Sequence, residues 1–139
     1  MAEIANIYGN FYVEALTGKI NLLTDTIKCM ICTSAYTPNA DTHKFLSDVT
    51  DEIVGTGYAK VTLANKTVAY DAVAKKVVFD ADDMIINNAT LTGARYVVLF
   101  ADSGVPVSSI LIGYVDLGAN RDLDDGTFKL IWDALGILN

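Results

Sequence analysis

The amino-acid sequence predicts an all-β fold, an antiparallel β-sandwich of jelly-roll-like topology with a short helical segment near its N-terminus. Short apolar or alternating runs, typical of strands, lie between frequent Gly, Asn and Asp residues. These runs are rich in Val, Ile, Thr, Tyr and Phe, which favour strands. Most connections are too short for a parallel crossover, so neighbouring strands are expected to be antiparallel. A closed barrel is the alternative.

The predicted strands are joined by segments with turn chemistry. We expect residues 64–66 and 71–75 to close hairpins between successive strands. Residues 102–106 and 122–126 combine Asp side chains with a flexible Gly, a combination that favours turns. The predicted strands, in order, are residues 26–33, 59–63, 67–70, 76–79, 84–86, 95–101, 110–117 and 127–132.

Two segments do not have the strand pattern. Residues 9–17 are predicted to form one or two helical turns, with Asn10 as N-cap and Gly18 as the C-terminal stop. Tyr12, Val13 and Leu16 would form a stripe on this helix. The long connection 34–57 is expected to contain a short helix within residues 42–49. A connection of this length inside a compact domain is commonly functional.

Two predicted strands, residues 95–101 and 110–117, are apolar on both faces. One face would lie in the core, and the other would need a second cover. A loop, the N-terminal segment or another subunit could supply it. We take the pattern as an indication of oligomerisation.

Composition excludes several broad classes of function. The chain has 139 residues, 52% of them hydrophobic, and a net charge of −7, which indicates a single domain over residues 1–139. Its basic residues are scattered, so we expect no nucleic-acid binding. No apolar run is long enough to span a membrane, and the first residues lack the pattern of a secretory signal.

Candidate chemical groups do not assemble into a recognisable active site. Cys29 and Cys32 form a C-x-x-C, which inside a strand places the thiols on opposite faces. We interpret both as buried apolar residues, with a metal or redox role as the alternative. His43 is interpreted as a surface or capping residue of its loop. A catalytic triad would need it, with Asp41 or Asp48 as its orienting partner.

Two acidic segments, residues 80–83 and 122–125, are interpreted as turns at strand ends. Closely spaced carboxylates also suit calcium, and whether they bind a cation is left open. The sequence Gly55-Thr56-Gly57 begins like a dinucleotide loop but lacks the third Gly. We therefore predict a protein that is not an enzyme, with no catalytic residues, no cofactor and no metal.

Several short motifs, spread over most of the chain, together carry a family resemblance. They are Asp25-Thr26-Ile27-Lys28, Thr33-Ser34-Ala35-Tyr36-Thr37-Pro38 followed by Asp41, His43 and Phe45, Asp48-Val49, Glu52, Gly55-Thr56-Gly57-Tyr58, Leu63-Ala64-Asn65-Lys66-Thr67-Val68, Phe79-Asp80-Ala81-Asp82-Asp83, Ala94-Arg95-Tyr96, Leu111-Ile112-Gly113-Tyr114 and Phe128 to Asp133. In their order and spacing the chain resembles small structural virion proteins of tailed bacteriophages. It departs from that pattern at Ala59-Lys60, where Gly is usual, and shortly after Asp82-Asp83, where this chain has Ile86 and an aromatic residue is common.

The resemblance implies a capsid cement or decoration protein, a small jelly-roll module that binds the major capsid protein and itself, as a homodimer or other homo-oligomer. Its expected location is the outer surface of the virion, after synthesis in the host cytoplasm. The alternatives are another virion component (a neck, tail, receptor-binding or carbohydrate-binding protein) and a small hydrolase.

We expect the contact surface to come from the N-terminal segment and the long connection. The expected contact residues are Ile4, Ile7, Tyr8, Phe11, Tyr12, Tyr36, Pro38, His43 and Phe45. Large aromatic side chains are typical of binding hot spots. Several of these residues could equally belong to the core, which is the preferred interpretation for Tyr12 and Phe45. Deletion of residues 37–45 is expected to leave the domain folded but weaken its attachment to the shell.

Overall fold

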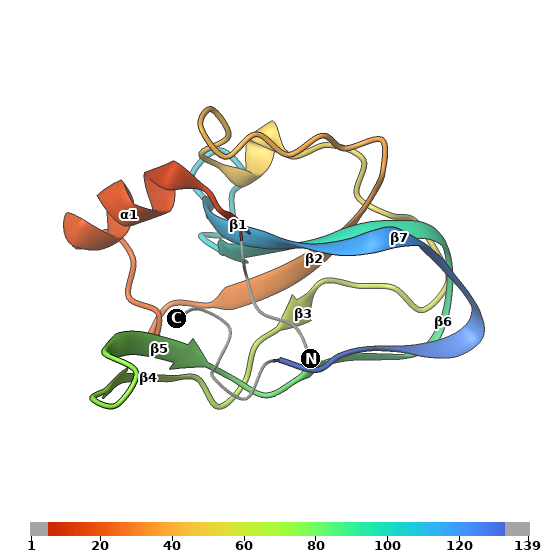
Figure 1. Cartoon of the computed structure of the whole chain (residues 1–139). Helices are drawn as coiled ribbons and strands as arrows, with labels where there is room; N and C mark the ends of the chain where they lie inside the picture. Colours follow the sequence, from red (N-terminus) through yellow and green to blue (C-terminus); the bar gives the residue numbers. More distant parts are fainter. Residues whose placement is uncertain (1–5, 133–139) are drawn as a thin grey trace.

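The computed structural model describes residues 6–132 of the chain. In these residues the protein is built from antiparallel strands and one short α-helix, so the all-β prediction is confirmed. The elements are β1 (Asn6–Ile7), α1 (Gly9–Leu16), β2 (Ile27–Thr33), the 3-10 helix η1 (Leu46–Asp48), β3 (Val61–Thr62), β4 (Thr67–Asp71), β5 (Lys76–Asp80), β6 (Met84–Ala101) and β7 (Ile110–Leu130) (Figure 1).

The strands form one five-stranded sheet, in the order β1-β7-β6-β2-β3, and a separate hairpin of β4 and β5. Every strand pair is antiparallel. A jelly roll would divide its strands between two sheets of four, and the strand order does not confirm this topology.

The centre of the fold is one long hairpin made by β6 and β7. Its ladder runs from Met84↔Leu130 to Ala101↔Ile110, with register shifts in its middle part. These irregularities bend the two strands together, and Figure 1 shows them leaving the sheet and returning beneath β2 and β3. The hairpin therefore supplies two layers that pack on each other.

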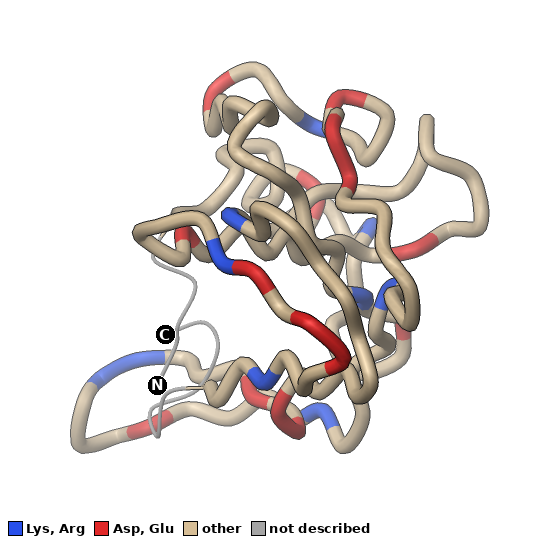
Figure 2. Tube along the Cα trace, turned by 90° about the vertical axis from the view of Figure 1, so that its right-hand side faces the viewer, with Lys and Arg blue, Asp and Glu red and all other residues tan. Residues whose placement is uncertain are grey.

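Four of the predicted strands are therefore parts of two long, continuous strands. Residues 84–86 and 95–101 both belong to β6, and residues 110–117 and 127–130 both belong to β7. The predicted turn at residues 122–126 is wrong, because these residues lie inside β7. Their turn-forming side chains serve the bend instead, where Asn88 and Asp125 have positive φ. In Figure 2, turned so that this bend faces the viewer, acidic positions follow one another along the chain.

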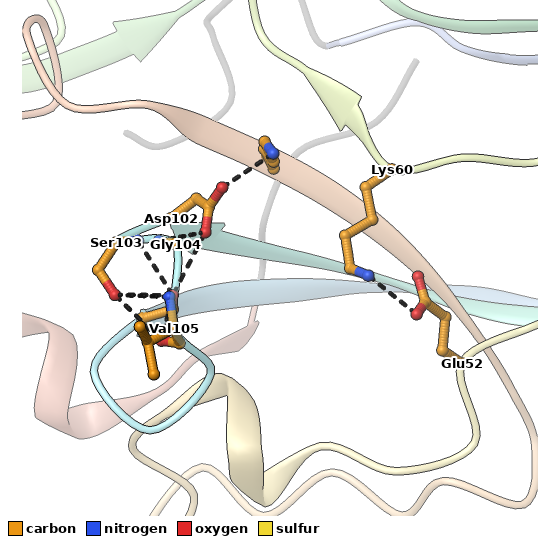
Figure 3. Close-up of polar contacts among 8 residues, drawn as sticks. Glu52, Lys60, Asp102, Ser103, Gly104 and Val105 are labelled. Atoms are coloured by element: carbon orange, nitrogen blue, oxygen red, sulfur yellow. Dashed lines mark hydrogen bonds and ion pairs between the residues drawn. The ribbon is translucent and has the colours of Figure 1, made fainter.

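The turn predicted at residues 102–106 does connect β6 to β7. Asp102 Oδ1 accepts a hydrogen bond from the Gly104 N–H (2.9 Å), and Gly104 has a φ of +88°. Asp102 Oδ2 also pairs with Lys28 Nζ on β2 at 2.8 Å. Figure 3 shows Asp102 at the centre of these contacts. The carboxylate therefore holds the turn against the neighbouring strand.

The β4–β5 hairpin confirms the turn predicted at residues 71–75. Asp71 Oδ1 accepts hydrogen bonds from the backbone N–H groups of Val73 and Ala74, and Lys75 adopts a φ of +60°. The hairpin predicted around residues 64–66 is wrong. Strand β3 pairs with β2, and Leu63 N–H donates to Ile27 O, so the chain before residue 64 belongs to the main sheet.

Helix α1 ends as predicted but begins differently. Gly18 has a φ of +81°, and the N–H groups of Gly18 and Lys19 donate to the carbonyls of Ala15 and Glu14, the pattern of a Schellman cap. The N-cap is Tyr8, with no side-chain cap, so the prediction of Asn10 is wrong. The helix buries Phe11 and Glu14, whereas its predicted stripe is exposed.

Two apolar clusters lie on opposite faces of the main sheet. The larger cluster lies between the two layers of the bent hairpin and includes Ile31, Leu99, Met84 and Phe128. The smaller one includes Met30, Val98 and Leu111, which Tyr8 and Tyr36 cover. Strands that are apolar on both faces are thus covered by the N-terminal segment and the long connection. Their pattern gives no indication of a second subunit.

Candidate interaction surface

The aromatic residues expected to contact a partner are divided between the interior and the surface. Tyr8, Phe11 and Tyr36 are buried within the described residues, so their side chains belong to the core and offer no contact surface in this fold. For these three the structure corrects the expectation. Tyr12 is 55% exposed, which contradicts the core interpretation of that residue.

The other expected contact residues occupy intermediate positions. Ile7, Pro38, His43 and Phe45 are half-buried, and Phe45 packs against the larger cluster, in line with its core interpretation. Ile4 lies outside the described residues.

The long connection is held in place by backbone hydrogen bonds rather than lying free on the surface. Gly9 N–H donates to Ala40 O (2.9 Å), Leu46 N–H to Ser109 O (2.8 Å) and Leu111 N–H to Lys44 O (3.0 Å). Residues 37–45 are therefore bound by hydrogen bonds both to the start of α1, at Gly9, and to β7, at Leu111. This arrangement argues against the expectation that their deletion leaves the domain folded.

His43 takes part in a chain of hydrogen bonds that begins in the core. The hydroxyls of Tyr8 and Tyr36 are 2.8 Å apart, and the Tyr36 hydroxyl is 2.9 Å from His43 Nδ1. Asn39 N–H also donates to Nδ1, so this nitrogen acts as an acceptor and Tyr36 is its second donor. Burial raises the pKa of Tyr36 to about 12, which keeps its hydroxyl protonated. The histidine thus holds the loop to Tyr36.

Next to this chain, two tyrosines of the main sheet form a half-buried aromatic group. The rings of Tyr96 and Tyr114 meet edge to face, with centroids 6.0 Å apart, and Tyr36 contacts Tyr96 in the same manner. The Arg95 guanidinium lies 5.6 Å from the Tyr96 ring centroid, and its Nε donates to Asp116 Oδ1 at 2.7 Å. This hydrogen bond lowers the pKa of the Asp116 carboxyl.

A second polar group connects the long connection to β2. Tyr58 donates its hydroxyl hydrogen to Glu52 Oε2 (2.7 Å) and accepts a hydrogen bond from the Ile31 N–H. Lys60 Nζ lies 3.0 Å from Glu52 Oε1 (Figure 3). Burial raises the pKa of Tyr58 above its usual range. The side chains of Tyr58, Glu52 and Lys60 thus join the segment around residues 52–60 to strand β2.

The two cysteines lie as the sequence predicts. Cys29 belongs to the larger cluster and Cys32 to the smaller one, so they are on opposite faces of β2. Both are free and buried. Burial raises the pKa of Cys32 to about 12 and that of Cys29 still further, so neither thiol ionises near neutral pH. A reactive cysteine needs the opposite shift.

The acidic segments act as hydrogen-bond acceptors between neighbouring segments. Asp82 Oδ2 accepts from Asn65 Nδ2, Asp83 Oδ1 from the Trp132 N–H, and Asp122 Oδ1 from the Gly93 N–H. Within residues 6–132, no group of three or more His, Cys, Asp or Glu side chains is placed to hold a metal ion.

Exposed apolar side chains occur on two separate elements, α1 and the β4–β5 hairpin, which both lie toward the left of Figure 1. The set, which we call the apolar end, is Tyr12, Val13 and Leu16 of α1 together with Val68, Tyr70, Val73 and Val77 of the hairpin. Leu16 is 86% exposed and Val73 is 95% exposed. Exposed apolar side chains are typical of the surfaces with which proteins contact partners.

The hairpin is the more unusual of these two elements. Val68, Tyr70, Val77 and Phe79 share one face, because Val68 pairs with Phe79 and Tyr70 pairs with Val77. Phe79 is buried in the larger cluster, whereas Tyr70 and Val77 are more than half exposed. The apolar face therefore begins in the core and continues outward without a cover among the described residues.

Comparisons with known proteins identify no relative for this chain. No family model matches it, and neither does any curated protein or solved structure. Among the described residues, α1 and η1 are the helices, and neither has the length and apolar character that crossing a membrane requires.

Proposed function

We propose that this protein is a structural component of a virion, of the cement or decoration type, which binds the major capsid protein on the outer surface of the shell. The observation that carries the proposal is the apolar end, on α1 and the β4–β5 hairpin. The resemblance to small phage virion proteins implies the major capsid protein as the partner of this surface. Binding to the assembled lattice would stabilise the shell by mass action.

The chemistry of the described residues supports an adhesive role over a catalytic one. The side chains best suited to catalysis are committed to structural contacts: His43 to Tyr36, Glu52 to Tyr58 and Lys60, and both cysteines to the two apolar clusters. A surface that binds a neighbour needs complementary shape and exposed apolar groups, and both α1 and the hairpin offer such groups.

The first test is the copy number of the protein in virions purified from its native source. A cement protein occurs in molar amounts close to those of the major capsid protein, which gel densitometry measures directly. A faint band would favour a neck, tail or receptor-binding component over a cement. The absence of any band would overturn the proposal of a virion protein altogether.

The second test maps the contact surface with purified chain added to shells that lack it. Leu16→Ser and Tyr70→Ser each remove an exposed apolar side chain from the apolar end. Because burial of such a side chain contributes about 1.5–3 kcal/mol, each variant should bind roughly ten- to a hundredfold more weakly. Val54→Ser is the control, since Val54 is 93% exposed and lies on the long connection. If Leu16→Ser and Tyr70→Ser bind the shells as tightly as Val54→Ser and the unmodified chain do, the apolar end is excluded as the attachment site.

A further inference from the structure

The outer edge of strand β5 has the properties of a strand that pairs with another chain. In the two-stranded sheet, β5 has β4 as its only neighbour among the described strands. Within residues 6–132, no backbone hydrogen bond joins residues 76–80 to any segment other than β4. In an antiparallel pair, part of the N–H and C=O groups of each strand point away from its partner. Such an edge is a template for a further strand.

The sequence of this strand is complementary to itself in the antiparallel direction. It reads Lys76-Val77-Val78-Phe79-Asp80, with opposite charges at its two ends. When two copies pair about a two-fold axis through Val78, Lys76 of each copy faces Asp80 of the other. Val77 faces Phe79, and Val78 faces Val78. Pairing of opposite charges and of apolar with aromatic residues across strands is favourable.

The apolar face of the hairpin continues across such a pairing. Val77 is 61% exposed and shares its face with Phe79, whose ring is buried at the base of the hairpin. Paired strands would place Val77 of each copy beside Phe79 of the second copy. The joined sheet would then carry one continuous apolar face, formed by both hairpins.

We propose that β5 is a homodimerisation strand, which pairs with β5 of a second copy across a two-fold axis at Val78 and joins the two hairpins into one four-stranded sheet. The charges of Lys76 and Asp80 favour this register over shifted ones, because opposite charges then face each other. They add little to the affinity, since exposed ion pairs contribute little free energy. The protein carries a net charge of −7, so the two copies repel each other elsewhere. A five-residue ladder is small for a stable interface, and we expect a weak, concentration-dependent dimer.

Cysteine cross-linking tests the register. Residues that face each other in an antiparallel pair have Cβ atoms about 4.5–5.5 Å apart, close to the distance that a disulfide needs. Val78→Cys should therefore give a disulfide-linked dimer under mild oxidation. Ala69→Cys is the matched control, because Ala69 faces Val78 within the hairpin but lies on β4, away from the proposed axis. The native Cys29 and Cys32 are buried and should not cross-link.

Each result bears on the proposal. A dimer with Val78→Cys and a monomer with Ala69→Cys would support it. A dimer with Ala69→Cys alone would overturn it in favour of the β4 edge. If neither variant cross-links, and the unmodified chain sediments as a monomer over about a hundredfold range of concentration, the edge does not pair with a second copy.

A charge exchange provides a test that does not depend on a new cysteine. Lys76→Glu should weaken the dimer by placing a second carboxylate opposite Asp80 of the other copy, and adding Asp80→Lys should restore part of the affinity. Circular dichroism checks that each variant remains folded. These measurements use the purified chain without shells. Failure of dimerisation is thus distinguishable from failure of the proposed capsid binding, on which this inference does not rest.

Discussion

At the scale of single residues, Gly55 and Gly57 show how closely two segments of backbone approach in this fold. A Cβ atom at Gly55 would lie 2.1 Å from Thr90 O, and one at Gly57 would lie 2.3 Å from Asn88 O. Thr56 O meanwhile accepts a hydrogen bond from the Thr90 N–H. The Gly-Thr-Gly motif therefore lets the long connection lie against β6, a structural role unlike that of a nucleotide-binding loop.

We predict that Gly57→Ala destabilises the protein more than Gly93→Ala does. Both glycines have a φ of +78°, so both substitutions introduce the same backbone strain, about 1–2 kcal/mol. Only Gly57 faces backbone atoms at short range, while a Cβ at Gly93 would meet nothing within 4 Å. The clash should add about 1–3 kcal/mol, measured by urea unfolding. Equal losses for the two variants would contradict the close approach.

The hydroxyl of Tyr36 provides a second prediction at this scale. Tyr36→Phe removes the group that joins Tyr8 to His43, leaving the buried Tyr8 hydroxyl without this partner. We expect a loss of about 1–3 kcal/mol in the free energy of unfolding. Tyr70→Phe is the control, because the Tyr70 side chain is 62% exposed and should change stability little. The Tyr8→Phe/Tyr36→Phe double variant should lose less than the sum of the two single losses.

At the scale of elements, β6 and β7 show why the number of strands is difficult to predict from this sequence. Asn88, Gly93, Gly118 and Asp125 all have positive φ. In the sequence such residues are typical of turns, so the local pattern predicts two short strands in place of each long one. In the structure the same backbone geometry produces bulges and a bend while the ladder continues. The local conformations were predictable, but their context was not.

We predict that deletion of residues 37–45 unfolds the domain or strongly destabilises it. In this segment the Ala40 carbonyl accepts a hydrogen bond from the Gly9 N–H, and the Lys44 carbonyl accepts one from the Leu111 N–H. The segment ends at the bridge between Phe45 and Ile110. Its loss would also remove His43, which stacks on the Tyr36 ring and hydrogen-bonds the Tyr36 hydroxyl. Circular dichroism and thermal unfolding would measure this effect. A cooperative transition at the temperature of the full chain would show that the connection is dispensable, as the sequence alone suggested.

At the scale of the whole molecule, the shifted pKa values predict how stability depends on pH. Asp102, Asp116 and Asp48 have lowered pKa values, caused first by hydrogen bonds from Lys28, from Arg95 and from the Lys44 N–H. Their contribution to stability is complete above about pH 4 and is lost as the pH falls through the folded pKa values. Asp102→Asn should make the acid side of the stability profile less steep.

The alkaline side follows from buried acids that stay protonated in the fold. Burial raises the pKa of Cys32 from 9.0 to about 12 and that of Tyr36 from 10.0 to about 12. Their contribution is complete below about pH 9 and is lost as the pH rises toward 12. Urea unfolding at a series of pH values should show a plateau that ends near pH 9. Cys32→Ala should make the alkaline decline less steep, and an unchanged slope would contradict this assignment.

The all-β class, the end of α1 at Gly18, the Asp71 turn and the opposite placement of the two cysteines can all be predicted from the amino-acid sequence. Each of these follows from local backbone preference or from the two-residue period of a strand, which neighbouring residues set. Other features became visible only in the folded chain: β3 joins β2, β6 and β7 bend as one hairpin, and Tyr8 and Tyr36 are core residues while Tyr12 is exposed. These features depend on which distant surfaces pack together, and local patterns do not encode that choice.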